Sequence, residues 1–185
     1  MKANAKNVST LAKRKEDENY DLRRYLKQQD ELSEEEVDRL VSDITRRVWA
    51  SFDCTGCANC CKQLGRSVTE QEVQRLAAAL VLSEEDFRSR YLEGKVGPDE
   101  DDEGDDEGGM RWRLRGKPCP FLKDDRCTVY EARPGQCRKY PYLYEPNFSF
   151  RTLGMIERTF TCPIVYHVLE ELKEELPFRR GGRAR

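Results

Sequence analysis

The sequence predicts a mainly α-helical fold with a small β-hairpin and much irregular structure, in a single cysteine-rich domain. Three observations support this fold class. Apolar residues recur at helical spacing in four segments, two short apolar runs flank a polar turn, and eight cysteines lie in segments without a periodic pattern. A chain of 185 residues has room for one domain of ordinary size.

The domain is expected to span residues 33–176, between a charged arm and a basic tail. Residues 1–32 form the predicted N-terminal arm, either helical or frayed, and residues 177–185 form the tail. Residues 98–109 are almost entirely Asp, Glu and Gly, and their spacing does not match a calcium-binding EF-hand loop. We therefore predict that this acidic segment is a solvated, disordered insertion.

Local end signals define the first two helices. Ser33 and Glu36 form a capping box, as do Thr69 and Glu72, each just ahead of an apolar stripe. The two stripes consist of Val37, Leu40, Val41, Ile44 and Val48, and of Val73, Leu76, Ala77 and Leu80. These spacings predict one helix that leads to the first cysteine and a second that follows the first cysteine cluster.

Two further helices are expected. Ser83 begins a short one with acidic residues in its first turn, and Phe87 and Tyr91 share a face of it. The other follows Cys162 and begins at Pro163, because proline suits a first helical turn. Its apolar face consists of Ile164, Val165, Val168, Leu169, Leu172 and Leu176.

Extended structure is expected between the helix that begins at Ser83 and the helix that begins at Pro163. Residues 111–115 alternate in the manner of a strand, and residues 121–130 form a predicted hairpin around the polar turn 123–126. Prolines and a glycine then bound a tight segment around Cys137.

Composition limits the classes of function. Hydrophobic and charged residues each make up 37% of the chain, so the core is small and a second source of stability is expected. A net charge of −2 lacks the basic excess of nucleic-acid binders, and no apolar run approaches the roughly 20 residues that cross a bilayer. Residues 1–7 are polar, so we expect no secretory signal and a cytoplasmic protein. We expect neither nucleic acid nor membrane as partner, and the sequence does not identify a protein partner.

Eight cysteines carry the strongest chemical signal. They are Cys54, Cys57, Cys60, Cys61, Cys119, Cys127, Cys137 and Cys162. In a reducing compartment, clustered cysteines bind metal more often than they form disulfides. Gly56 and Asn59 tolerate the unusual backbone angles that a tight metal-binding turn requires. Because a structural zinc contributes about 10–16 kcal/mol in small peptides, we predict that metal stabilises this domain.

Two sites of four thiolates are the simplest division of eight cysteines. Cys54, Cys57 and Cys60 with the distant Cys162-Pro163 resemble a ferredoxin pattern, which leaves Cys61, Cys119, Cys127 and Cys137 for a second site. This division requires adjacent Cys60 and Cys61 to point in different directions. Against it, a four-residue turn is expected to put Cys119 and Cys127 on opposite faces of the hairpin.

Residues beside the cysteines are expected to support the metal. Lys62, Arg126, Arg138 and Lys139 are candidate compensating charges. Arg133, Arg138, Tyr130 and Tyr140 are expected to pack against and hydrogen-bond the cysteine loops. The single histidine, His167, lies away from the centre of the last apolar stripe and is not expected to bind metal.

A set of motifs resembles a known family. The motifs are the run from Cys54 to Cys61, Pro118-Cys119-Pro120-Phe121-Leu122, Cys127-Thr128-Val129-Tyr130, Arg133-Pro134-Gly135-Gln136-Cys137-Arg138-Lys139-Tyr140-Pro141 and Cys162-Pro163. From about Phe52 to Leu172 the chain is similar to the CxxCxxCC cysteine-cluster family of the YkgJ type. The resemblance implies chelation of zinc or iron through these cysteines. A distant branch methylates lysines of flagellin, but the glycine-rich strand-to-helix turn of a nucleotide site is missing from this sequence, so that activity is not carried over.

The sequence therefore predicts a protein that chelates zinc or iron, including iron in an iron–sulfur cluster, through eight cysteines. One alternative is an iron–sulfur protein that transfers electrons or assists an enzyme, for which a brown colour is diagnostic. The other is an interaction adaptor with a metal-stabilised surface, for which partner capture through residues 1–32 is diagnostic. No nucleophile–base pair or carboxylate pair stands out in the sequence, so we make no prediction of catalysis.

Overall fold

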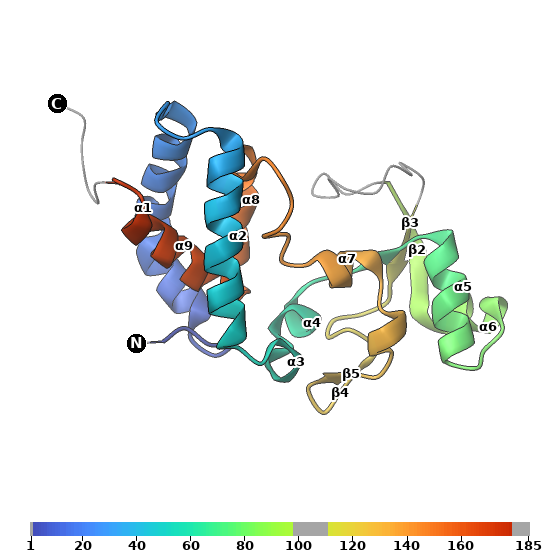
Figure 1. Cartoon of the computed structure of the whole chain (residues 1–185). Helices are drawn as coiled ribbons and strands as arrows, with labels where there is room; N and C mark the ends of the chain where they lie inside the picture. Colours follow the sequence, from blue (N-terminus) through green and yellow to red (C-terminus); the bar gives the residue numbers. More distant parts are fainter. Residues whose placement is uncertain (1, 98–110, 179–185) are drawn as a thin grey trace. The chain divides into compact units, whose positions relative to one another are not determined.

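The computed structural model describes residues 2–97 and 111–178, and it confirms the predicted fold class (Figure 1). The chain is mostly helical, with a small antiparallel sheet, a short hairpin and irregular connections. It divides into two compact units, Met1–Cys57 with Pro141–Arg185, and Ala58–Tyr140. We name them the helical unit and the cysteine unit and describe each by itself. The predicted insertion 98–109 and residues 179–185 of the tail lie outside the described residues, and the proposed domain boundaries remain predictions.

Helices build the helical unit. They are α1 (Val8–Gln28), α2 (Glu34–Ala50), the short α3 (Cys54–Cys57), α8 (Phe148–Thr159) and α9 (Pro163–Glu175). Both α1 and α2 pack against α8 and α9. Capping and stripe predictions for α2 and α9 are confirmed: Ser33 and Glu36 form the capping box, and Pro163 occupies the first turn of α9.

The N-terminal segment contains a helix that belongs to the core of this unit. Leu22 and Leu26 of α1 are buried, and so is Asn19, whose side-chain oxygen accepts a hydrogen bond from Lys173 Nζ at 2.9 Å. Lys173 also pairs with Glu18 and Glu170. This network satisfies a lysine whose side chain is entirely buried, as a buried charge requires.

Short helices, strands and loops build the cysteine unit. Its elements are α4 (Asn59–Gln63), β1 (Ser67–Val68), α5 (Glu70–Ala79), α6 (Glu84–Tyr91), β2 (Leu92–Val96), β3 (Arg111–Leu114), β4 (Leu122–Lys123), β5 (Arg126–Cys127), the 3₁₀ turn η1 (Tyr130–Ala132) and α7 (Gly135–Lys139). The sheet has the antiparallel order β1-β3-β2. The predicted capping box of α5 and the predicted strand at residues 111–115 are confirmed.

The predicted hairpin is also present, as β4 and β5. Leu122 pairs with Cys127 and Lys123 pairs with Arg126. Between them Asp124 and Asp125 have φ angles of 49° and 58°, the left-handed conformation that a two-residue hairpin turn needs. Asp is one of the residue types that tolerates this conformation.

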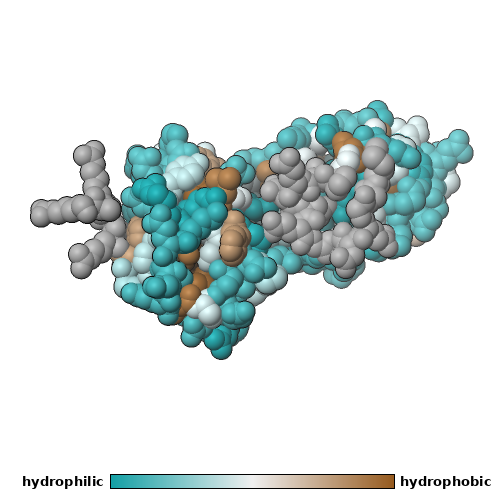
Figure 2. Space-filling model, turned by 90° about the horizontal axis from the view of Figure 1, so that it is seen from above, coloured by the Kyte–Doolittle hydropathy of each residue, from teal (hydrophilic) through white to brown (hydrophobic). Residues whose placement is uncertain are grey.

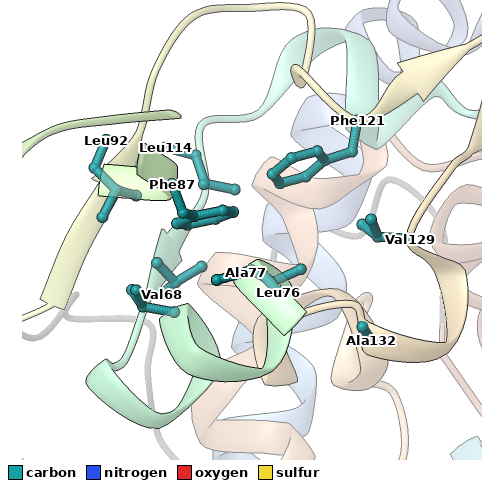
Figure 3. Packing of buried hydrophobic residues seen from close by; sticks show 10 residues of the cluster. Val68, Leu76, Ala77, Phe87, Leu92, Leu114, Phe121, Val129 and Ala132 are labelled. Atoms are coloured by element: carbon teal, nitrogen blue, oxygen red, sulfur yellow. The ribbon is translucent and has the colours of Figure 1, made fainter. Parts of the chain in front are cut away.

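A compact apolar core holds the cysteine unit together (Figure 3). Phe87 of α6 is fully buried and lies among Leu92, Leu114 and Phe121. Cys119 and Cys127 are partly buried against this same core. The core therefore fixes two cysteine loops before any metal is considered.

The outer surface agrees with the sequence composition. On the side seen in Figure 2, hydrophilic residues cover most of the described surface and hydrophobic residues form separate small patches. Among the described residues, no helix has the length and apolar character needed to cross a membrane.

Candidate metal centre

The first two cysteines of the cysteine unit are neighbours on α4. Ala58 precedes this helix with a φ angle of 50°, so the left-handed residue of the turn is Ala58. The prediction that Gly56 and Asn59 carry unusual backbone angles is therefore wrong, because both have helical neighbours and belong to α3 and α4. The short helix α4 carries Cys60 and Cys61 in consecutive positions.

The pKa values of Cys60 and Cys61 shift in opposite directions. Interaction with the Cys61 thiol lowers the pKa of Cys60 below its ordinary value, whereas interaction with Cys60, together with burial, raises the pKa of Cys61. That these two side chains point in different directions stays a prediction.

Cys119 and Cys127 reach the same region from the hairpin. The backbone N–H of Cys119 donates to the carbonyl of Cys61 at 2.8 Å, which ties the hairpin loop to α4. Burial raises the pKa of the Cys119 thiol, and the charges of Cys127 and Cys60 raise it further. That the hairpin turn puts Cys119 and Cys127 on opposite faces stays a prediction.

Cys137 lies on α7, which two long-range hydrogen bonds hold in place. The side-chain oxygen of Gln136 accepts from the backbone N–H of Ser67 at 3.2 Å, and the carboxylate of Glu72 accepts from the N–H of Gly135 at 2.6 Å. Burial raises the pKa of the Cys137 thiol to about 11, with the charges of Cys119 and Cys60 adding to the effect. Strand β1 and helix α5 thus position the last cysteine of this unit.

Arg66 is a charged residue near the cysteines that the sequence analysis did not single out. Its positive charge lowers the pKa of Cys60 and opposes the rise in the pKa of Cys137, and its guanidinium lies over the ring of Tyr140, 5.0 Å from the ring centroid. Its positive charge also opposes the rise in the pKa of Cys119. The bases that the sequence indicated lie within two positions of a cysteine, whereas Arg66 is five positions after Cys61.

Two of the bases predicted to compensate the metal have other partners. Lys62 forms an ion pair with Asp125 at 2.6 Å. Arg138 donates to the backbone carbonyls of Arg133 and Glu131. Arg138 therefore stabilises the loop at residues 131–133, which precedes Cys137.

The residues predicted to support the loops lie around this loop. Arg133 donates to the carbonyl of Tyr130 at 2.7 Å and its guanidinium lies 3.8 Å from the centroid of the Tyr130 ring. Tyr140 lies under Arg66. Their predicted role in supporting a metal centre stays a prediction.

Cys54, Cys57 and Cys162 belong to the helical unit. Cys54 and Cys57 lie on α3, where the Asp53 carboxylate accepts from the N–H of Gly56 at 3.0 Å and so caps the helix. Cys162 is buried directly before α9. That these three cysteines bind metal stays a prediction.

The donor set fits zinc or iron in its chemistry. All eight cysteines lie in the described residues, and all are thiols rather than disulfides. In the cysteine unit their charges raise one another's pKa, so a cation is needed before several of them ionise together. Within residues 2–97 and 111–178, however, no three His, Cys, Asp or Glu side chains are close enough to form a ready-made metal site.

These observations define a cysteine-rich protein whose eight free thiols lie on segments far apart in the sequence. Residues 53–163, more than half of the chain, match the family model described as "CxxCxxCC: Putative zinc- or iron-chelating domain". The chain belongs to this family. A search of solved structures finds no match.

Proposed function

We propose that the protein chelates zinc or iron, with Cys60, Cys61, Cys119 and Cys137 as the principal donors. The observation that carries this proposal is the backbone hydrogen bond of 2.8 Å from Cys119 to Cys61, which joins the hairpin loop to α4, two segments far apart in the sequence. Cys137 lies on α7, which the bond between Ser67 and Gln136 attaches to β1 of the same unit. Membership of the zinc- or iron-chelating family supports it independently.

Thiolate ligands suit a structural zinc and an iron–sulfur cluster equally well. When bound, either group supplies the positive charge that lets several neighbouring cysteines ionise together. The residues of the chain have the remaining tasks. Cys119 is held by packing against the apolar core. The helix that carries Cys137 is held by hydrogen bonds of Gln136 and Glu72. The backbone hydrogen bond from Cys119 to Cys61 joins the hairpin loop to α4.

Cys127 is the candidate additional donor of this unit. Like Cys119, it packs against the apolar core, and its charge raises the pKa of Cys119. It lies on β5, after the hairpin turn, rather than on α4. A reducing compartment such as the cytoplasm keeps all of these thiols available for metal, which fits the proposed function.

Cobalt substitution tests the proposal directly. The metal-free protein is loaded with Co²⁺, and the sulfur-to-cobalt charge-transfer absorption is compared between the wild type and Cys→Ser variants at Cys61, Cys119, Cys127 and Cys137. This absorption grows with the number of thiolates on the ion. We expect strong absorption in the wild type and a clear loss in the Cys61, Cys119 and Cys137 variants. Wild-type absorption in all four variants would contradict the proposal.

A further inference from the structure

Exposed apolar side chains of the helical unit gather on α1 and α8. Six large hydrophobic side chains are exposed in the part of the chain that the structure describes, and three of them lie on these two packed helices: Tyr20, Phe150 and Leu153. Phe150 is 69% exposed and Leu153 is 42% exposed. Single apolar residues on a surface need no explanation, whereas a cluster of them commonly marks an interaction site.

The exposed face of α8 is a single stripe along the helix. It consists of Phe150, Leu153, Gly154 and Glu157. Successive spacings of three, one and three positions put these residues on one side of the helix, while Thr152, Met155 and Ile156 are buried. Gly154 leaves the middle of the stripe without a side chain, which allows another backbone to come close.

The two ends of this stripe carry opposite charges. At its beginning, Lys27 of α1 lies over the ring of Phe150, with Nζ 5.9 Å from the ring centroid. At its end the residue is the exposed acid Glu157. Within residues 2–97 and 111–178, neither Lys27 nor Glu157 forms an ion pair. The stripe is therefore apolar in the middle, basic at one end and acidic at the other.

This pattern is complementary to itself when a second copy is turned around. A two-fold axis pairs a surface patch with the same patch of the partner, so that residue i meets residue j and j meets i. When two α8 helices run antiparallel and cross between Leu153 and Gly154, Phe150 and Glu157 are equally far from the centre. Lys27 of each copy then lies beside the acid of the other, and the leucines fill the middle.

We propose that two copies of this chain associate through α8 in this antiparallel arrangement, with Lys27 of each copy paired to Glu157 of the other. Tyr20 lies seven positions before Lys27, on the same side of α1, and widens the apolar face. A face of two helices is small among specific interfaces, so we expect a dimer that forms at micromolar concentration or above. This inference is independent of the proposed function, because neither α1 nor α8 carries a cysteine.

The test measures the mass of the full-length chain by sedimentation equilibrium, from micromolar to millimolar concentration, with a reductant that prevents disulfides between copies. Five samples are compared: wild type, Lys27→Glu, Glu157→Lys, an equal mixture of these two variants, and the control Arg39→Glu. Arg39 is exposed on α2, so its variant makes the same change of charge as Lys27→Glu on another helix of the unit. Circular dichroism of each protein reports folding.

We expect the wild type to form a reversible dimer. Each charge reversal puts like charges at both ends of the pairing, so the dimer dissociation constant should rise about tenfold or more. In the mixture, a chain of one variant meets a chain of the other, and opposite charges face each other again at both ends. Association of the mixture should therefore return close to that of the wild type, and Arg39→Glu should match the wild type.

A wild type that stays monomeric over this range overturns the inference, and so does a dimer that neither reversal weakens. If both single variants are weakened and their mixture does not recover, the antiparallel pairing is overturned. Should either reversed variant fail to fold, Phe150→Ser decides, since it removes an exposed ring from the same stripe. Unchanged dimerisation of that variant overturns the proposal, and a loss of dimer upholds it. The metal content of the wild type tests the proposed function separately.

Discussion

His167 holds the beginning of the chain against the last helix. In the neutral tautomer with an unprotonated Nε2, this nitrogen accepts from the backbone N–H of Ala3 at 3.1 Å; the Ala3 carbonyl lies 3.4 Å from the same atom, and the ring of Phe52 lies 5.3 Å from the imidazole. Burial lowers the pKa of His167, and Lys2 lowers it further, while the Ala3 contact and the carboxylates of Glu171 and Glu170 act in the opposite direction. The neutral imidazole is the form that fits this place.

This depressed pKa predicts a loss of stability in mild acid. Above its ordinary pKa of about 6.5, His167 is neutral in both folded and unfolded chains, and its contribution is complete. As the pH falls below that value, the unfolded chain binds a proton that the folded chain resists, and the free energy of unfolding decreases. Urea unfolding at several pH values measures this. In His167→Gln, which keeps an acceptor for Ala3, the decrease should be smaller; equal pH profiles would contradict the account.

Gly56 lies where a side chain has no room. A Cβ there would be 2.6 Å from the Asp53 carboxylate that caps α3. We expect Gly56→Ala to displace the cap and to cost about 1 kcal/mol of stability, as the loss of an N-cap does. Gly65→Ala is the matched control, since its Cβ would meet only the flexible end of Lys117 at 3.4 Å. Thermal unfolding of both variants is the measurement, and an equal effect would contradict this reading of Gly56.

Single residues show what the sequence could and could not predict. The cysteines were recognisable because two-residue spacings and Cys-Pro pairs are local patterns. Arg66 was not, because the strand that follows it is attached to the helix of Cys137 by the bond between Ser67 and Gln136, 69 positions apart. Gly56 was expected to supply an unusual backbone angle, whereas its importance is the lack of a side chain beside Asp53.

Among the helices, α8 depends on a cap supplied by another helix. The backbone N–H groups of Asn147 and Phe148 donate to the Asp38 carboxylate of α2 at 2.8 and 2.9 Å. The N–H of Ser149 donates to Glu34 at 2.7 Å. Negative charge at this end also suits the helix dipole. Two acidic residues of α2 therefore satisfy the first turn of α8.

Removal of this cap should destabilise the helical unit. We expect Asp38→Ala to lower the free energy of unfolding by about 1–2 kcal/mol, because two N–H groups lose their acceptor. Asp43→Ala is the control on the same helix, since Asp43 is exposed and pairs only with its neighbour Arg46 in the described structure; its effect should stay within about 0.5 kcal/mol. Equal losses in the two variants would show that the contact with α8 contributes nothing.

The helices that the sequence predicted are those whose end signals are local. The capping boxes of α2 and α5, and the cap at Ser83, lie within a few residues of the helices they begin. Helix α8 was missed because, in the described part of the chain, no side-chain hydrogen bond from its own N-cap residue marks its start. Its cap comes from a residue more than a hundred positions earlier.

The acidic segment 98–109 connects two strands that already lie side by side. Val96 of β2 pairs with Arg111 of β3, so the two ends of the segment are held together by the sheet. Replacing residues 98–109 with a short Asn-Gly turn should leave the sheet closed and the metal content unchanged. Metal analysis and circular dichroism of the shortened protein test this. A loss of metal on shortening would place a ligand within the segment.

For the whole chain, composition predicted a need for stabilisation beyond the apolar core, and the gathered thiols are where metal would supply it. The most direct test is the zinc, iron and acid-labile sulfide content of untagged protein purified without oxygen, in the wild type and in Cys61→Ser. We predict stoichiometric zinc, or iron with matching sulfide, in the wild type, and a large loss in the variant. A folded wild-type protein that contains neither metal, and that takes up none when supplied, would contradict the central claim.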